Sequence, residues 1–154
     1  MKKLRQIINN NGIFLASLLF VTMIVLPQLL TGNRPANYQE QLLVDMSKNI
    51  VTITQLRAIV FTLILVNTTL VYRLLSAWMS KRRAGLSIFM LASIPVWLVM
   101  QVSLPVLSLV MLPLLISLLA FDKAGRSTNS VGWYALSGLA VSVSWVLEPV
   151  ATSI

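Results

Sequence analysis

The sequence predicts an all-α fold: a polytopic transmembrane helical bundle of four to five short spans, in a single domain over residues 1–154. Two observations predict it. Hydrophobic residues make up 57% of the chain and charged residues only 10%, with a mean hydropathy of +0.85, whereas soluble domains are about 45–50% apolar and about 25% charged. The apolar residues also gather in runs near the roughly 20 residues that cross a bilayer. The lipid bilayer is therefore the expected solvent.

The first apolar run covers residues 12–31 and carries no charge, which predicts one membrane-crossing helix. The basic start MKKLRQ also fits a cleaved signal peptide. However, the apolar stretch exceeds the usual roughly 7–15 residues, and no A-x-A-like cleavage site follows it. A retained signal-anchor is therefore preferred, and Pro27 predicts a kink near its outer end.

Residues 32–55 are the main polar stretch, and they are expected outside the cell membrane. Apolar residues recur there at helical spacing, at Tyr38, Leu42, Met46, Ile50 and Ile53. This pattern predicts an amphipathic helix lying on the external interface. A solvated connector that packs against the outer ends of the spans is an equally good interpretation.

The second span is expected over residues 56–79, and Asn67 is the most polar residue near its middle. A lone helix cannot satisfy the donors and acceptors of its amide, so Asn67 should face another helix. An interhelical hydrogen bond is favoured over a substrate contact. Arg73 lies about a turn and a half from the inner end of the span, where it can extend to the headgroups.

Residues 86–121 form one apolar run that would make a helix about 54 Å long, too long for a bilayer. The polar interruption at Gln101, followed by Pro105, predicts a proline-containing hairpin of two short helices, 86–100 and 104–121. Two arrangements fit. The hairpin is either a pair of thin spans or a re-entrant loop in which Gln101 is buried in protein or faces a wet cavity.

The last span is expected over residues 131–150 and is rich in small residues. Gly138 and Ser142 form a small-xxx-small pair, and so do Ala140 and Ser144. Such pairs let the backbone of a neighbouring helix approach closely. Gly138 and Ser142 are therefore predicted to be helix-packing residues, together with Asn67 and Gln101.

The basic residues predict the orientation of the chain. Nine of the twelve lie near the N-terminus, at the inner end of the second span, or in two expected cytoplasmic loops, 80–85 and 122–130; the other three are at positions 34, 48 and 57. Lys and Arg accumulate in cytoplasmic loops, which predicts a multi-pass protein of a bacterial inner membrane with a cytoplasmic N-terminus. Bases in separate membrane-flanking clusters do not form a nucleic-acid surface, so no nucleic-acid partner is expected.

Arg57 and Glu148 are expected about one turn inside the outer interface, on different spans. Each charge is costly to leave unpaired there, which predicts an ion pair between them. In the alternative, both side chains extend independently to the headgroups.

The sequence predicts no enzyme, no catalytic residue, no cofactor and no metal site. It contains no Cys and no His, which excludes thiol nucleophiles, imidazole acid/base groups and the usual zinc or haem ligands. The four carboxylates, Glu40, Asp45, Asp122 and Glu148, are not placed as an acid/base pair, and there is no phosphate-binding or nucleophile motif.

These observations favour a non-catalytic protein that acts through helix–helix association, as an accessory or assembly subunit of a larger inner-membrane complex. Its expected partners are other membrane subunits or a second copy of itself. Two alternatives remain: an immunity or exclusion protein against a pore-forming toxin or incoming machinery, and a small transporter or channel. The Pro-containing hairpin is the only feature that favours transport.

Overall fold

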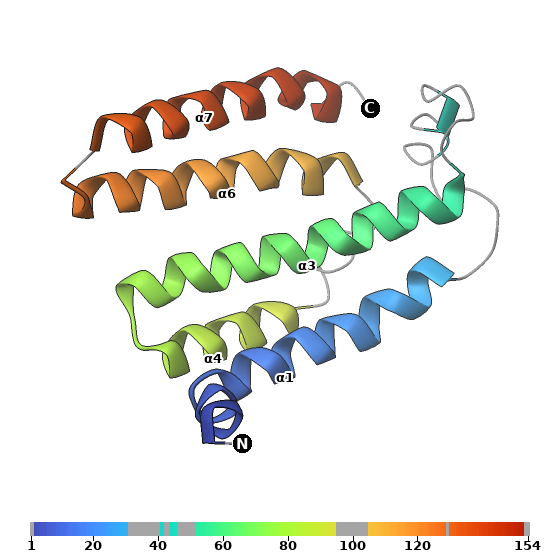
Figure 1. Cartoon of the computed structure of the whole chain (residues 1–154). Coiled ribbons are helices and arrows are strands. Elements are labelled where there is room, and N and C mark those ends of the chain that lie inside the picture. Colours follow the sequence, from blue (N-terminus) through green and yellow to red (C-terminus); the bar gives the residue numbers. More distant parts are fainter. Residues whose placement is uncertain are drawn as a thin grey trace.

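The computed structural model describes residues 2–30, 41, 44–45, 52–94, 105–128 and 130–152. Their main elements are α1 (Lys2–Leu30), α3 (Ile53–Trp78), α4 (Lys81–Ala92), α6 (Pro105–Arg126) and α7 (Ser130–Thr152), shown in Figure 1. No described residue lies in a strand. The all-α class is therefore confirmed.

Three of the helices are long and apolar enough to cross a membrane. These segments are Ile53–Trp78, Leu107–Arg126 and Ser130–Leu147, and Asn11–Pro27 is a shorter apolar helical segment. The predicted four to five spans and the hairpin around Gln101 stay predictions, because residues 95–104 lie outside the described part of the chain. The same holds for the larger part of the expected interfacial helix in 32–55.

The helices continue past the expected spans at their basic ends, which corrects two predicted loops. Residues 81–85 belong to α4, which begins at Lys81, and α6 runs on to Arg126. The expected loops 80–85 and 122–130 are therefore mostly helical. Hydropathy marks only the length of helix that fits the hydrocarbon, whereas Lys and Arg are good helix formers that let a helix continue beyond it.

The start of α3 is fixed by a capping box. The Thr52 side chain accepts a hydrogen bond from the Gln55 backbone N–H, and the Gln55 side chain accepts one from the Thr52 backbone N–H. These bonds satisfy two donors that a helix start otherwise leaves open. They place the first residue of α3 at Ile53, ahead of the expected start at residue 56.

The helices pack in a fixed order, visible in Figure 1. The α7 helix packs on α6, α6 packs on α3, and α3, α1 and α4 all pack on one another. The N-terminus, the α3–α4 connection and the α6–α7 connection lie at the same end of the bundle. We call it the basic end, because most Lys and Arg residues of the chain flank these three points.

Two apolar clusters join α1, α3 and α4. One is formed by Val21, Val25, Val60, Ile64 and Ala92. The other, nearer the basic end, is formed by Phe14, Tyr72, Ala84 and Ile88. Their members repeat mostly every four residues within each helix, so they share one helix face. These three helices therefore share one apolar core, and α6 and α7 pack beside it with buried residues of their own, such as Ala120 and Ala140.

Gly85 sets the distance between α1 and α4. A Cβ atom at Gly85 would lie 3.2 Å from the Ile13 Cβ and 3.2 Å from the Phe14 backbone nitrogen. The Ser17 hydroxyl, which is fully buried, donates to the Ile13 carbonyl at 2.8 Å and approaches the Gly85 carbonyl at 3.4 Å. The two helices therefore touch through their backbones at this point.

Candidate functional site

Asn67 connects α3 to α6 in the apolar part of the bundle. Its side chain is 4% exposed, and its Nδ2 donates to the Ser108 carbonyl on α6 at 2.9 Å. Its Oδ1 is buried and has no hydrogen-bond partner among the described residues. The amide thus faces a neighbouring helix, as expected of a polar group at this depth. Its NH₂ group has a hydrogen-bond partner among the described residues, whereas its oxygen has none.

The two small-residue pairs of α7 point in different directions. Ala140 and Ser144 are buried against α6, with the Ser144 hydroxyl 3.5 Å from the Val110 carbonyl. Gly138 and Ser142 are exposed, and a Cβ atom at Gly138 would meet nothing within 4 Å. The Gly138–Ser142 pair therefore packs against none of the described helices, and it is open to a neighbouring helix.

The exposed face of α7 also carries a shallow hollow. It has a volume of about 420 Å³ and is lined by Val141, Ser142, Trp145 and Val146. The Ser142 hydroxyl donates to the Gly138 carbonyl at 3.0 Å. The hollow therefore presents a mainly apolar surface, and the hydroxyl proton of Ser142 already takes part in a hydrogen bond within α7.

The remaining predicted site residues are only partly described. Arg57 is 4% exposed, so its side chain is buried in the described structure. Glu148 lies in α7, but its side chain is outside the described part, as is Gln101 altogether. Helix α6 packs between α3 and α7 (Figure 1). The ion pair of Arg57 with Glu148 stays a prediction.

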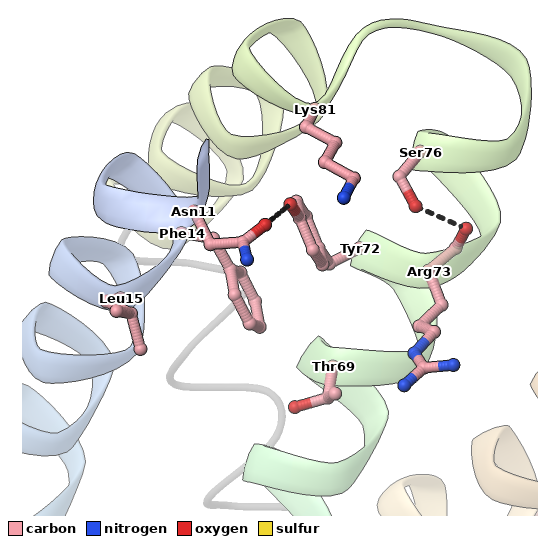
Figure 2. A pocket seen from close by; sticks show the side chains of 8 residues that line it. All are labelled: Asn11, Phe14, Leu15, Thr69, Tyr72, Arg73, Ser76 and Lys81. Carbon is pink, nitrogen blue, oxygen red and sulfur yellow. Dashed lines mark hydrogen bonds between the residues drawn. The ribbon is translucent and has the colours of Figure 1, made fainter. Parts of the chain in front are cut away.

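A second cavity lies at the basic end, between α1, α3 and the start of α4 (Figure 2). We call it the basic cavity, and its volume is about 510 Å³. It is lined by Asn11, Phe14, Leu15, Thr69, Tyr72, Arg73, Ser76 and Lys81. Its lining combines two cations with four uncharged polar side chains on an apolar base.

Ring stacking and one hydrogen bond fix the floor of the basic cavity. The Phe14 and Tyr72 rings stack with centroids 3.9 Å apart and planes 8° from parallel. The Tyr72 hydroxyl donates to the Asn11 Oδ1 at 2.7 Å. Figure 2 shows the Lys81 side chain extending from α4 towards this pair, whereas the Arg73 guanidinium lies on the Thr69 side.

The cations of the basic cavity have no carboxylate beside them in the described part of the chain. Asp122 accepts instead from Arg126 at 2.8 Å and from the Trp78 indole nitrogen at 3.0 Å, which joins α6 to the end of α3. Arg73 and Lys81 are both exposed. The cavity is therefore a positively charged recess.

The basic cavity is not predicted by the sequence. Arg73 and Lys81 fit signals of topology and of extension to the headgroups, and no sequence pattern assigns a role to Asn11 or Tyr72. The cavity exists only because α1, α3 and α4 are neighbours, which no local pattern specifies. The available signal was the run Asn9, Asn10 and Asn11 directly before the first apolar stretch.

The fold defines the class of this chain: it is all-helical, and three of its helices are compatible with a membrane protein. Comparison with protein-family models, curated proteins and solved structures finds no match.

Proposed function

We propose that this chain is a non-catalytic integral protein of a bacterial inner membrane and acts through helix–helix association as an accessory or assembly subunit of a larger membrane complex. The outward face of α7 carries the proposal. The absence of Cys and His from the sequence supports its non-catalytic part. The proposed occupant of the α7 face is a transmembrane helix of another subunit.

Three properties of the α7 face support a helix partner. Helices associate in lipid chiefly through close packing, so small residues are enriched where backbones meet. Gly138 and Ser142 supply such a site on the side of α7 that faces away from α6. The Ser142 hydroxyl already donates a hydrogen bond to the Gly138 carbonyl. A partner helix that covers this face therefore does not bury an unpaired hydroxyl donor. The flanking Trp145, 76% exposed, forms a ridge beside the hollow.

We expect Gly138→Leu and Ser142→Leu to weaken association with the partner. A branched side chain on the small face would hold the partner backbone away, and overpacking of this kind costs about 1–3 kcal/mol. The amount of partner recovered in a mild-detergent pull-down should fall roughly 5- to 150-fold at limiting concentration. The chain itself should fold unchanged, because a Cβ atom at Gly138 meets no atom of the described residues within 4 Å.

Val143→Leu is the matched control, since Val143 is exposed on α7 but lies about 100° round the helix from Ser142. It should leave partner recovery unchanged. The cysteine-free sequence also allows a single Gly138→Cys to be cross-linked without background. A cross-link to a second protein is expected. A cross-link only to another copy would contradict the subunit role, and labelling by lipid alone would contradict helix association.

The proposed threading gives a separate prediction. Lys48→Cys should react with a membrane-impermeant thiol reagent in intact cells, whereas Arg82→Cys should not. The reason is the positive-inside rule, supported by the gathering of the N-terminus and both helix connections at one end of the bundle (Figure 1). Arg82→Cys must become reactive after the cells are opened, which serves as its control. Labelling of Arg82→Cys in intact cells would reverse the orientation.

A further inference from the structure

We propose that the basic cavity binds a phosphate group, held by Arg73, Lys81 and the amide of Asn11. This inference does not depend on the helix-association role, because the cavity lies between α1, α3 and α4, away from the outward face of α7. Four features of the cavity support it: its charge, its free donors, the start of α4 and its depth in the bundle.

The positive charge of the cavity favours the binding of an anion. Arg73 and Lys81 line it, and no described carboxylate lies against either cation. Two unneutralised cations at one recess repel each other, and the repulsion is stronger beside apolar walls than in open water. Arg and Lys are the residues that proteins use to bind phosphate oxygens. A bound phosphate would therefore remove an unfavourable interaction as well as add favourable ones.

Hydrogen bonding leaves donors in the cavity for such an anion. The Asn11 Oδ1 is occupied by the Tyr72 hydroxyl, so the amide orientation is fixed and its Nδ2 is left to donate. Figure 2 shows this nitrogen beside the Phe14 ring. The hydroxyls of Thr69 and Ser76 donate to carbonyls of their own helix. The donors left for a ligand are thus those of Asn11, Arg73 and Lys81, and a phosphate group offers several acceptor oxygens to match them.

The start of α4 adds to the positive potential. The first turn of α4 contains Lys81, Arg82 and Arg83 and no acidic residue, and Ser80 makes no side-chain capping bond. A helix start has open N–H groups and the positive end of the helix dipole, so acidic residues or anions are normally favoured there. Three bases at this position are unfavourable by themselves. An anion beside Lys81 would offset that conflict.

The depth of the cavity suits a phospholipid headgroup. Arg73 lies five residues before the end of α3 at Trp78, about 7–8 Å along the helix axis. Trp78 is 77% exposed at that end, where an interfacial aromatic residue is expected. Leu15, which is exposed and lines the cavity, offers an apolar wall for the glycerol and upper acyl chain. The phosphate comes either from such a lipid or from a soluble phosphate compound.

The test titrates the full-length protein in neutral detergent with phosphatidylglycerol, with phosphatidylcholine and with inorganic phosphate, and follows the thermal midpoint. Phosphatidylglycerol should raise the midpoint of the wild type. Arg73→Gln and Lys81→Gln should each raise the half-saturating concentration roughly tenfold, since a charge-assisted bond is lost. Arg82→Gln is the control: Arg82 is exposed in the same turn as Lys81 but does not line the cavity. Because Arg82 contributes only to the general positive potential of the first turn of α4, this variant should raise the half-saturating concentration much less than either cavity variant does.

The titrations with phosphatidylglycerol and with inorganic phosphate distinguish the two sources of the phosphate group. If inorganic phosphate stabilises the wild type and both cavity variants weaken this effect, the site exists and its ligand is a soluble phosphate compound. Stabilisation by phosphatidylglycerol alone would support the lipid. The proposal is overturned if neither ligand acts, or if Arg82→Gln weakens binding as much as the cavity variants. It is also overturned if phosphatidylcholine, which carries a phosphate but no net charge, stabilises the wild type and the cavity variants equally. Lys81→Gln, which leaves α3 unchanged, decides the test if Arg73→Gln is unstable without ligand.

Discussion

Replacing Gly85 with leucine is expected to separate α1 from α4 and to remove most of the folded protein. A Cβ atom there would already lie 3.2 Å from the Phe14 backbone nitrogen. Because this neighbour is backbone, it cannot turn away as the end of a flexible side chain could. Overpacking typically costs about 1–3 kcal/mol, and occasionally more. We expect Gly85→Leu to reach the upper end of this range and Gly85→Ala the lower.

The surroundings of Gly85 explain why the strain cannot be relieved locally. Ser17 and Ala84 are fully buried beside it, and Ile88 is nearly so. Moving α1 outward would weaken the Ser17 contact with the Gly85 carbonyl and open the cluster that contains Phe14 and Ile88. Interiors are close-packed, so a shift of this kind spreads through several side chains.

The measurement is the temperature at which half of the detergent-solubilised protein leaves the monodisperse fraction. Gly138→Leu is the matched control, because it adds the same side chain to an apolar helix at a position where an added Cβ atom meets no described residue within 4 Å. The midpoint should fall strongly for Gly85→Leu and stay near the wild-type value for Gly138→Leu. Equal midpoints for the two variants would show that α1 and α4 do not meet through Gly85.

The class of the fold and its main apolar helices were predictable from the sequence, because they depend on local composition. An uncharged run such as 104–121 predicts a long apolar helix without any knowledge of its neighbours, and α6 contains such a helix. Helix ends were predicted less well. The hydropathy that located the expected span 86–100 says nothing about Lys81, Arg82 and Arg83, which extend α4 by their own helix propensity.

The site could be predicted only in its parts. The pairs Gly138–Ser142 and Ala140–Ser144 have the same spacing, so the sequence cannot tell which pair meets α6. Asn67 was identifiable because a buried amide needs a partner in any arrangement. The basic cavity and the contact at Gly85 arise from residues far apart in the sequence, and only the packing of three helices brings them together.

Asn67→Asp is expected to destabilise the bundle far more than Asn67→Leu. The aspartate side chain has nearly the shape of asparagine, but when ionised it cannot donate to the Ser108 carbonyl, which accepts from Asn67 at 2.9 Å. A carboxylate at this buried position faces a carbonyl dipole of the same sign. Insertion scales alone give roughly 2.5–3.5 kcal/mol for Asp at a membrane helix centre. We expect a loss of at least about 3 kcal/mol.

Asn67→Leu should be mild because two opposing terms nearly cancel. The variant loses an interhelical hydrogen bond, worth about 0.6 kcal/mol on average and at most roughly 1.7 in a membrane bundle. It also removes the Oδ1, which is buried without a partner among the described residues, and an unsatisfied buried acceptor costs about 1–3 kcal/mol. The net change should lie within about 1 kcal/mol.

Asn67→Ala completes the series by removing the amide without replacing its volume. It should fall between the other two variants, because the void left between α3 and α6 forfeits packing contacts that leucine restores. Thermal midpoints in detergent would rank the variants as Leu, then Ala, then Asp, from mildest to most severe. If Asn67→Leu proves as damaging as Asn67→Asp, the Oδ1 must accept a bond that stabilises the bundle. If Asn67→Leu folds normally but no longer recovers its partner, the amide acts in recognition and not only in holding α3 to α6.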